Sequence, residues 1–79
     1  MRYHIYVHGF LKNVVPPRFR RRPVSLESDA PLTVYKMLTA MLGIKTLDAT
    51  VLVKGKIVSS EYALQDGDEV HIYSPIAGG

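Results

Sequence analysis

Residues 29–44, DAPLTVYKMLTAMLGI, contain the element on which the expected fold depends. Apolar residues recur there at the spacing of one helix face: Val34, Met37, Leu38, Met41 and Leu42. Thr33 precedes this stripe, and a threonine hydroxyl at the N-cap accepts a hydrogen bond from a backbone N–H of the first turn. Gly43 follows it, where helices commonly end in a left-handed residue. The stretch therefore predicts a helix of about ten residues with one face buried against a sheet.

Two strands are expected before this helix. Residues 2–8, RYHIYVH, alternate between polar residues and an inward-facing set formed by Tyr3, Ile5 and Val7. Residues 23–27, PVSLE, resume the alternation and, as the next strand, are expected to pair antiparallel with the first. Residues 9–22 lie between them, include the Pro16-Pro17 pair and show no regular pattern, so a long loop is expected there.

A hairpin is expected after the helix. Residues 49–60, ATVLVKGKIVSS, predict two short strands joined by a turn at Lys54-Gly55-Lys56. We then expect a single helical turn that buries Tyr62 and Leu64, followed by a tight turn centred on Gly67.

The last strand is expected over residues 69–75, EVHIYSP, with Val70 and Ile72 facing inward. A single short helix covers only one face of a sheet. The first and last strands are therefore most simply buried as neighbours beneath it. This order of elements indicates an α+β fold in which a mixed sheet of four to five strands packs on one helix.

The composition is that of one small globular domain. The chain has 79 residues, of which 47% are hydrophobic and 22% are charged, as in ordinary folded domains. It contains no cysteine, which excludes a disulfide framework, a thiolate metal site and a cysteine nucleophile. The N-terminus lacks the features of a signal peptide, and no stretch approaches the roughly 20 apolar residues that span a membrane. We therefore expect a cytoplasmic protein with no membrane partner.

Positive charge is concentrated near the N-terminus. Residues 1–22 contain no acid, although they contain these basic residues: Arg2, Lys12, Arg18, Arg20, Arg21 and Arg22. Four of the arginines surround Phe19. Three interpretations stay open for this run: a solvated, solubilising loop, a contact with an acidic patch on a protein partner, or a contact with nucleic-acid phosphates. Nucleic acid is the least favoured of the three.

The expected outer face of the sheet carries aromatic residues. Tyr6 and Tyr73 alternate out of phase with the buried residues, and such a patch on an uncovered face suggests a protein-docking surface. The histidines of the two strands, His4, His8 and His71, are expected on the same face. If the first and last strands are neighbours, two or three of them could converge. No carboxylate at strand spacing supports them, so ordinary exposed or interface histidines are favoured over a metal site.

No catalytic constellation is evident in the sequence. The chain has no pairing of a nucleophile with a base and no phosphate-cradling loop. Asp66 and Asp68 flank Gly67, and aspartates beside a turn glycine usually bond the local backbone. We therefore expect a structural role for both.

The end of the chain, LQDGDEVHIYSPIAGG (64–79), resembles the β-grasp sulfur-carrier family, which is ubiquitin-like and includes the small subunit of molybdopterin synthase and the thiamine-pathway sulfur carrier. The matching residues are Leu64, Asp66, Gly67, Asp68, Val70, Ile76, Ala77, Gly78 and Gly79. PLTVYKML (31–38) and VLVKGKIV (51–58) are also similar to the family. The resemblance implies a β-grasp domain over residues 1–74 and a flexible tail over 75–79.

The resemblance also implies a function for the tail. In the family, an adenylating enzyme of the ubiquitin-activating type joins the C-terminal carboxylate to AMP, and sulfur then replaces AMP to give a thiocarboxylate. The reactive residue here would be Gly79, preceded by Gly78, with ATP and Mg²⁺ supplied at the activating enzyme and no cofactor bound by this chain. A sulfur-donor protein and an acceptor synthase subunit complete the implied partners. Their expected contacts are Tyr6, Tyr73, Pro75, Ile76, Ala77, Arg18, Arg20, Arg21 and Arg22.

Two departures from the family leave the pathway open. The hairpin turn is VKG where the family usually has Val-Asn-Gly, and residues 9–22 match neither branch. Molybdopterin synthesis is favoured because SPIAGG and the longer first loop are closer to that branch. The alternatives are a thiamine-pathway or tRNA-thiolation carrier, a ubiquitin-like protein modifier, or a β-grasp module that binds RNA or protein. In every carrier reading the chain is a co-substrate and not an enzyme.

Overall fold

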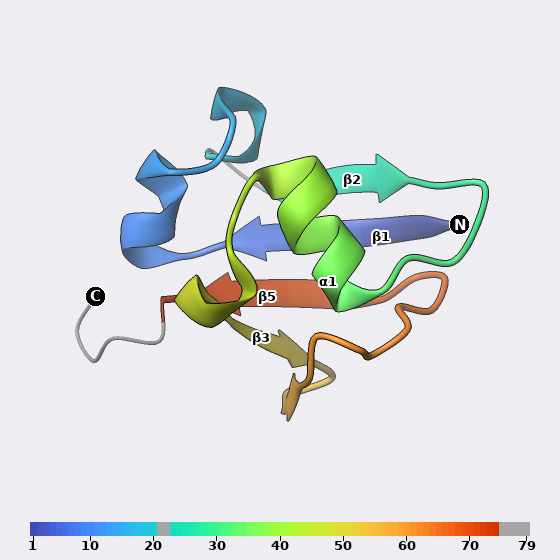
Figure 1. The fold of residues 1–79 in the computed structure, drawn as a ribbon. Helices are drawn as coiled ribbons and strands as arrows, with labels where there is room; N and C mark the ends of the chain where they lie inside the picture. The colour runs from blue at the N-terminus through green and yellow to red at the C-terminus, as the bar shows by residue number, and fades with distance from the viewer. Residues whose placement is uncertain (21–22, 75–79) are drawn as a thin grey trace.

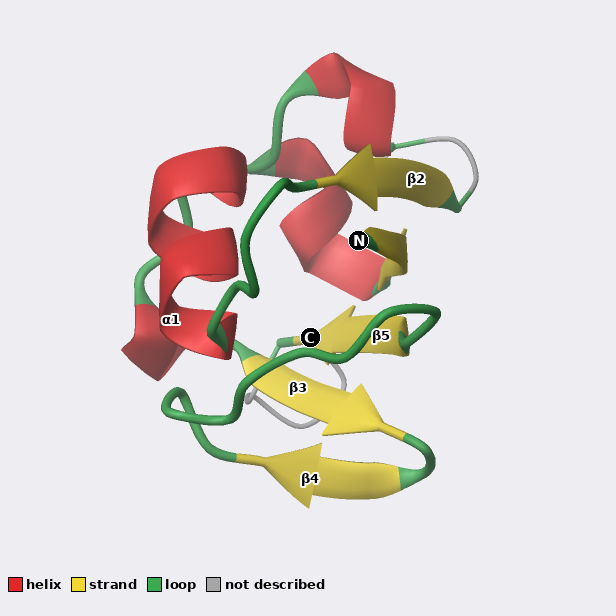
Figure 2. Cartoon of the chain, turned by 90° about the vertical axis from the view of Figure 1, so that its right-hand side faces the viewer, coloured by secondary structure: helices red, strands yellow, loops and turns green. Residues whose placement is uncertain are grey.

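The computed structural model describes residues 1–20 and 23–74, and shows one sheet with one principal helix on it (Figure 1). The strands, in the sheet order β2-β1-β5-β3-β4, are β2 (Val24–Glu27), β1 (Arg2–Val7), β5 (Glu69–Tyr73), β3 (Thr50–Val53) and β4 (Lys56–Val58). Figure 2 shows α1 on one side of these strands. The expected α+β class, with a mixed sheet on one helix, is confirmed.

The first and last strands of the chain lie side by side at the centre of the sheet. β1 runs parallel to β5, with Tyr6 opposite His71, and antiparallel to β2, with Tyr3 opposite Leu26. β3 is antiparallel to both β5 and β4. Because β1 and β5 are parallel, they end at the same edge of the domain. The expected hairpin, its turn and the neighbouring first and last strands are all confirmed.

The helix begins and ends where the sequence predicts. It consists of α1 (Val34–Lys36) and η3 (Met37–Leu42). The Thr33 hydroxyl accepts from the Lys36 N–H at 3.1 Å, and Gly43 has φ of 70°, the left-handed value that a glycine adopts without strain. The Ile44 N–H then donates to the Leu38 carbonyl at 2.9 Å, which closes the C-terminal cap.

The second half of the helix is wound more widely than an ordinary α-helix. η3 has π-type backbone hydrogen bonds. In this stretch the Thr39 hydroxyl donates to the Tyr35 carbonyl at 2.8 Å, a side-chain bond that competes with the regular backbone ladder.

One hydrophobic core fills the space between helix and sheet. The buried side chains of the strands are Tyr3, Ile5, Val7, Leu26, Val51, Val53, Val70 and Ile72, and those of the helix are Val34, Met37, Leu38 and Leu42. The predicted inward faces of β1 and β5 are therefore confirmed. Met41, the remaining member of the predicted stripe, is only partly buried at the margin of the core.

The expectation of an irregular loop over residues 9–22 was wrong for the part that the structure describes. This segment contains two short 3-10 turns, η1 (Gly9–Asn13) and η2 (Pro17–Phe19). Leu11, Val15 and Phe19 from it join the core, each less than 5% exposed. Their regular spacing of four residues was a sequence signal that they are buried together. The two prolines favoured the prediction of a loop, although proline suits the first position of such a turn.

The segment before the last strand also differs from expectation. Residues 60–61 form a turn rather than a helical turn, and Ala63 makes an isolated bridge with Thr33. Leu64 is buried as expected, whereas Tyr62 is half-buried. Pairing with the chain before the helix satisfies the backbone of this segment before β5, in place of a local helical turn.

Another short 3-10 turn, η4 (Thr46–Asp48), precedes β3.

Both turn aspartates bond backbone N–H groups, but only the bond of Asp68 is local, as predicted, whereas that of Asp66 reaches the start of β1. Asp66 accepts a hydrogen bond from the Arg2 N–H at 2.7 Å, and Asp68 accepts one from the Gln65 N–H at 2.8 Å. Gly67 between them has φ of 87°. The aspartates thereby tie the turn to the start of β1 and to itself. Across residues 1–20 and 23–74, no helix has the length and apolar character needed to cross a membrane.

Candidate docking surface and tail exit

The sheet face turned away from α1 presents a row of side chains that crosses four strands. Tyr6 of β1 lies opposite His71 of β5, His71 opposite Leu52 of β3, and Leu52 opposite Ile57 of β4. Ile57 is 74% exposed, which is unusual for a large aliphatic side chain. The cross-strand register and the period-two alternation place these four residues together on the outer face.

Four rings at the β1–β5 end of this row form a compact unit, here called the aromatic cluster: Tyr6, His8, His71 and Tyr73. Tyr6 stacks on His71 with ring centroids 4.4 Å apart and planes at 13°, and Tyr73 stacks on His8 at 4.3 Å and 5°. The predicted placement of both tyrosines on one outer face is therefore confirmed. The two histidines that join them were also expected on this face, and the structure brings them together; their stacking against the tyrosines was not predicted.

The two histidines meet edge to edge. His8 Nε2 lies 2.9 Å from His71 Nδ1, whereas the ring centroids are 5.2 Å apart. The facing nitrogens are much closer together than the ring centres, as in rings that meet at their edges. The nearly parallel rings are thus joined by an in-plane N–H···N hydrogen bond and do not overlap face to face. One ring donates and the other accepts, so the bond exists only while at least one of the two is neutral.

The surroundings of His8 favour its neutral form. Burial is the main cause that lowers the pKa of His8, and the nearby His71 and Lys12 lower it further. On the far side of the pair, His71 Nε2 lies 3.8 Å from a carboxylate oxygen of Glu69, two residues earlier on β5, so the expectation of no carboxylate at strand spacing was wrong for His71. Among the residues that the structure describes, no three histidine or carboxylate side chains converge as a metal site, and the sequence favoured none.

The aromatic cluster lies where the chain leaves the sheet. β5 ends at Tyr73, and the His8 N–H just beyond β1 donates to the Ile72 carbonyl at 2.9 Å. The residues that follow, 75–79, lie outside the described part of the chain, so the expected contacts of Pro75, Ile76 and Ala77 and the expected reactive residues Gly78 and Gly79 are not described. The cluster nevertheless adjoins the point from which that segment continues.

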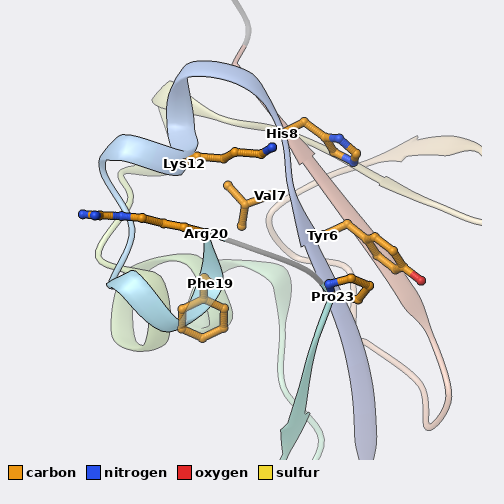
Figure 3. Close-up of a pocket in the computed structure, with 7 residues that line it drawn as sticks. All are labelled: Tyr6, Val7, His8, Lys12, Phe19, Arg20 and Pro23. Carbon is orange, nitrogen blue, oxygen red and sulfur yellow. The ribbon is translucent and has the colours of Figure 1, made fainter.

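The two arginines of the run that the structure describes, Arg18 and Arg20, have different surroundings. The Arg18 guanidinium lies over the Phe19 ring, 4.7 Å from its centroid, while the ring itself is buried. Arg20 is exposed and its stem lines a hollow of about 140 Å³, together with Tyr6, Val7, His8, Lys12, Phe19 and Pro23 (Figure 3). Arg21 and Arg22 lie outside the described residues. The run is therefore anchored to the core through Phe19.

Comparison with solved structures identifies the fold. SAMP1 from Haloferax volcanii, in one crystal structure, matches with a TM-score of 0.71 at 20% sequence identity, covering 100% of this chain and 100% of that chain. A second crystal structure, of H. volcanii small archaeal modifier protein 1, matches with a TM-score of 0.70 at 20% sequence identity. The match covers 95% of this chain and 98% of that chain. No curated protein sequence matches the chain. The structural likeness confirms the ubiquitin-like β-grasp fold.

The sequence itself matches a family. The model of the ThiS family matches residues 19–79, a span that begins at the buried Phe19 and includes the helix and every strand except β1. The unmatched part is β1 and the connection that carries η1, where the sequence departs from the family. Because the match covers well over half of the chain, this protein belongs to the ThiS family of ubiquitin-like, β-grasp sulfur-carrier proteins.

Proposed function

We propose that this chain carries sulfur on Gly79, whose carboxylate a partner enzyme adenylates and then converts to a thiocarboxylate. The observation that supports the proposal is the family match, which continues through β5 to residue 79. That span includes the Asp66-Gly67-Asp68 turn at the start of β5 and the terminal Gly78-Gly79 pair. A turn and a tail at this separation are more specific evidence for a sulfur carrier than a terminal glycine pair alone.

The proposed chemistry has two steps. A carboxylate oxygen of Gly79 attacks the α-phosphorus of ATP, forming an acyl adenylate and releasing pyrophosphate. A sulfur atom at the oxidation level of sulfide, delivered by a donor protein, then attacks the acyl carbon, and AMP leaves. An α-carboxyl group ordinarily has a pKa of about 3.5, so it is ionised and nucleophilic at neutral pH. ATP and Mg²⁺ belong to the adenylating enzyme in this scheme, and the carrier is its co-substrate.

The residue types of the tail suit this role. Glycine has no Cβ, so Gly78 and Gly79 can enter a narrow slot and adopt backbone angles closed to other residues. Pro75 lacks a backbone N–H and restricts φ, which favours a tail that leaves the sheet and does not extend it. In this proposal residues 75–79 are a flexible tail, and Ile76 and Ala77 contact the partner that receives it.

The aromatic cluster is the proposed docking surface for the adenylating enzyme. It combines large, flat side chains with a position beside the strand end from which the tail continues. Tyrosine is enriched in protein interfaces because it buries much area and loses little conformational freedom. Tyr73 is 39% exposed, and Ile57, at the far end of the row beyond Leu52, extends the apolar surface across the sheet. An enzyme seated there would hold the fold while the tail reaches its active site.

Within the carrier function, we propose that the sulfur serves molybdopterin synthesis, with this chain as the small, sulfur-donating subunit beside an acceptor synthase subunit. The SPIAGG ending and the long β1–β2 connection, with its two 3-10 turns, support this branch. A ubiquitin-like protein modifier is the second candidate, because the solved structures that share the fold are of a small archaeal modifier protein. Thiamine synthesis and tRNA thiolation are the other carrier pathways.

Intact mass of the protein purified from its native cells tests the proposal. A carrier shows a mass increase equal to the replacement of one oxygen by sulfur, located by fragmentation to Gly79. A modifier shows instead an isopeptide bond between Gly79 and a lysine of another protein. A β-grasp binding module shows neither, and keeps its activity when Gly78 and Gly79 are deleted.

A further inference from the structure

A small hollow lies beside the aromatic cluster, between the end of β1 and the connection to β2 (Figure 3). Its floor is apolar, because Val7 and Phe19 belong to the buried core. Its basic groups come from three separate places: His8 follows β1, Lys12 lies in η1, and Arg20 follows η2. We call this the basic pocket. Its volume of about 140 Å³ suits one side chain rather than a nucleotide.

No acidic side chain lines the basic pocket among the residues that the structure describes. Within residues 1–20 and 23–74, the ion pairs join Arg2 to Glu27 and Glu69 to His71, so neither involves Lys12 or Arg20. Among these described residues, Lys12 and Arg20 therefore lie at one pocket without an ion-paired counter-charge.

The charge of Lys12 acts on the wall of the pocket. Figure 3 shows the Lys12 side chain extending across the pocket toward β1, and its charge contributes to the lowered pKa of His8. Arg20 contributes its stem to the wall, and its guanidinium points away from Lys12 and the other labelled side chains. An anion entering the hollow therefore meets Lys12, while Arg20 adds positive charge to the surrounding surface.

The pocket and the docking surface share two residues. Tyr6 and His8 belong to the aromatic cluster and also line the hollow. A protein seated on the cluster therefore lies over or beside the pocket mouth. A carboxylate on an aliphatic stem suits a hollow with an apolar floor and cations at its sides, whereas a nucleic-acid backbone needs a longer track of cations than this single hollow gives.

We propose that the basic pocket receives an aspartate or glutamate side chain of the adenylating enzyme that docks on the aromatic cluster. This inference rests on the proposed function. The carboxylate pairs with Lys12, and Arg20 steers its approach, as charges at the rim of an interface commonly do. The contact fixes the orientation of the carrier on the enzyme while the tail enters the active site.

The test measures ATP–pyrophosphate exchange by the cognate adenylating enzyme as the carrier concentration is varied. Replacing both cations, Lys12→Gln with Arg20→Gln, is expected to raise KM for the carrier about tenfold and to leave kcat unchanged. The control removes the same charge from exposed positions away from the pocket, Lys36→Gln with Lys45→Gln, and is expected to leave KM within about twofold of the wild type. Circular dichroism establishes that both variants are folded.

The outcomes are distinguishable. An unchanged KM in the pocket variant, or an equal rise in the control, overturns the pocket and leaves the carrier function standing. If the wild type retains tRNA in a salt-dependent way and the pocket variant loses this retention with KM unaltered, the pocket binds nucleic acid and the proposal is overturned. Absence of exchange with the wild-type carrier overturns the proposed function and this inference with it. A selective rise in KM that high salt abolishes supports the pocket.

Discussion

His8 and His71 come from opposite ends of the chain, yet their imidazole rings share a hydrogen bond with 2.9 Å between Nε2 and Nδ1. The parallel pairing of β1 with β5 brings them together, and each ring supports one tyrosine of the aromatic cluster. The bond therefore links the two stacked pairs, Tyr6 with His71 and Tyr73 with His8, into one unit. Surface rings held in this way lose less conformational freedom when a partner binds.

Acidification should destabilise the fold through His8. Burial, His71 and Lys12 lower the pKa of His8 from 6.5, so the unfolded chain takes up this proton before the folded chain does. The contribution is present above pH about 6.5 and is lost as the pH falls through the lower pKa of the folded state. Urea unfolding at several pH values is expected to show a smaller acid-dependent loss of stability in His8→Gln than in the wild type.

His4→Gln, on β1 and outside the cluster, is the control for this prediction. It is expected to keep the acid-dependent loss of the wild type. Equal pH dependence in His8→Gln and the wild type would show that His8 does not contribute.

Truncation of the two cluster tyrosines should weaken docking without unfolding the domain. Tyr6→Ser with Tyr73→Ser removes both stacked rings from the outer face, and loss of interface tyrosines raises a dissociation constant about tenfold or more. Calorimetric titration of the adenylating enzyme measures this effect. Tyr35→Ser removes a ring that is 55% exposed on α1, away from the cluster, and should leave the affinity unaltered. If the double variant bound as tightly as the wild type, the cluster would not be the docking surface.

The connection between β1 and β2 should be essential to stability. Phe19 is 2% exposed, and Phe19→Ala leaves a cavity beneath η2 that is expected to cost about 3–5 kcal/mol of the free energy of unfolding. Phe10 lies in η1 of the same connection but is 62% exposed, so Phe10→Ala is expected to cost less than about 0.5 kcal/mol. Urea denaturation compares the two, and similar losses would contradict the assignment of Phe19 to the core.

The end of the helix gives a prediction about backbone conformation alone. Gly43 has φ of 70°, and an added Cβ would meet no atom within 4 Å. Gly43→Ala is therefore expected to cost about 1–2 kcal/mol through left-handed strain without any steric clash. Gly43→Asn should cost less, because asparagine tolerates this conformation better. Thermal unfolding of the two variants provides the comparison, and equal losses would point to another cause.

Much of the fold could be predicted from local patterns. The helix limits follow from Thr33, the apolar stripe and Gly43, and the buried faces of β1 and β5 follow from period-two alternation. The connection that buries Phe19 could not be predicted in the same way, because tertiary packing decides which apolar residues of an irregular segment are buried. The prediction of a helical turn before β5 was wrong for a similar reason, because a bridge from Ala63 to Thr33 replaced local helical bonds.

The candidate site could be predicted only in outline. Alternation placed Tyr6 and Tyr73 outward, and the neighbouring first and last strands placed them on one surface. The hydrogen bond between His8 and His71 depends on the register of the parallel pair, which alternation alone does not give. The basic pocket depends on how η1 and η2 fold back against β1, and the sequence showed only a run of charge.

The central claim is that the carboxylate of Gly79 is the group that the partner enzyme activates. ATP–pyrophosphate exchange with the cognate adenylating enzyme tests it most directly, with the wild-type carrier compared with a carrier extended by one residue after Gly79. The account predicts robust exchange with the wild type and none with the extended chain, whose α-carboxylate no longer belongs to Gly79. Exchange that proceeds equally with both chains would contradict it.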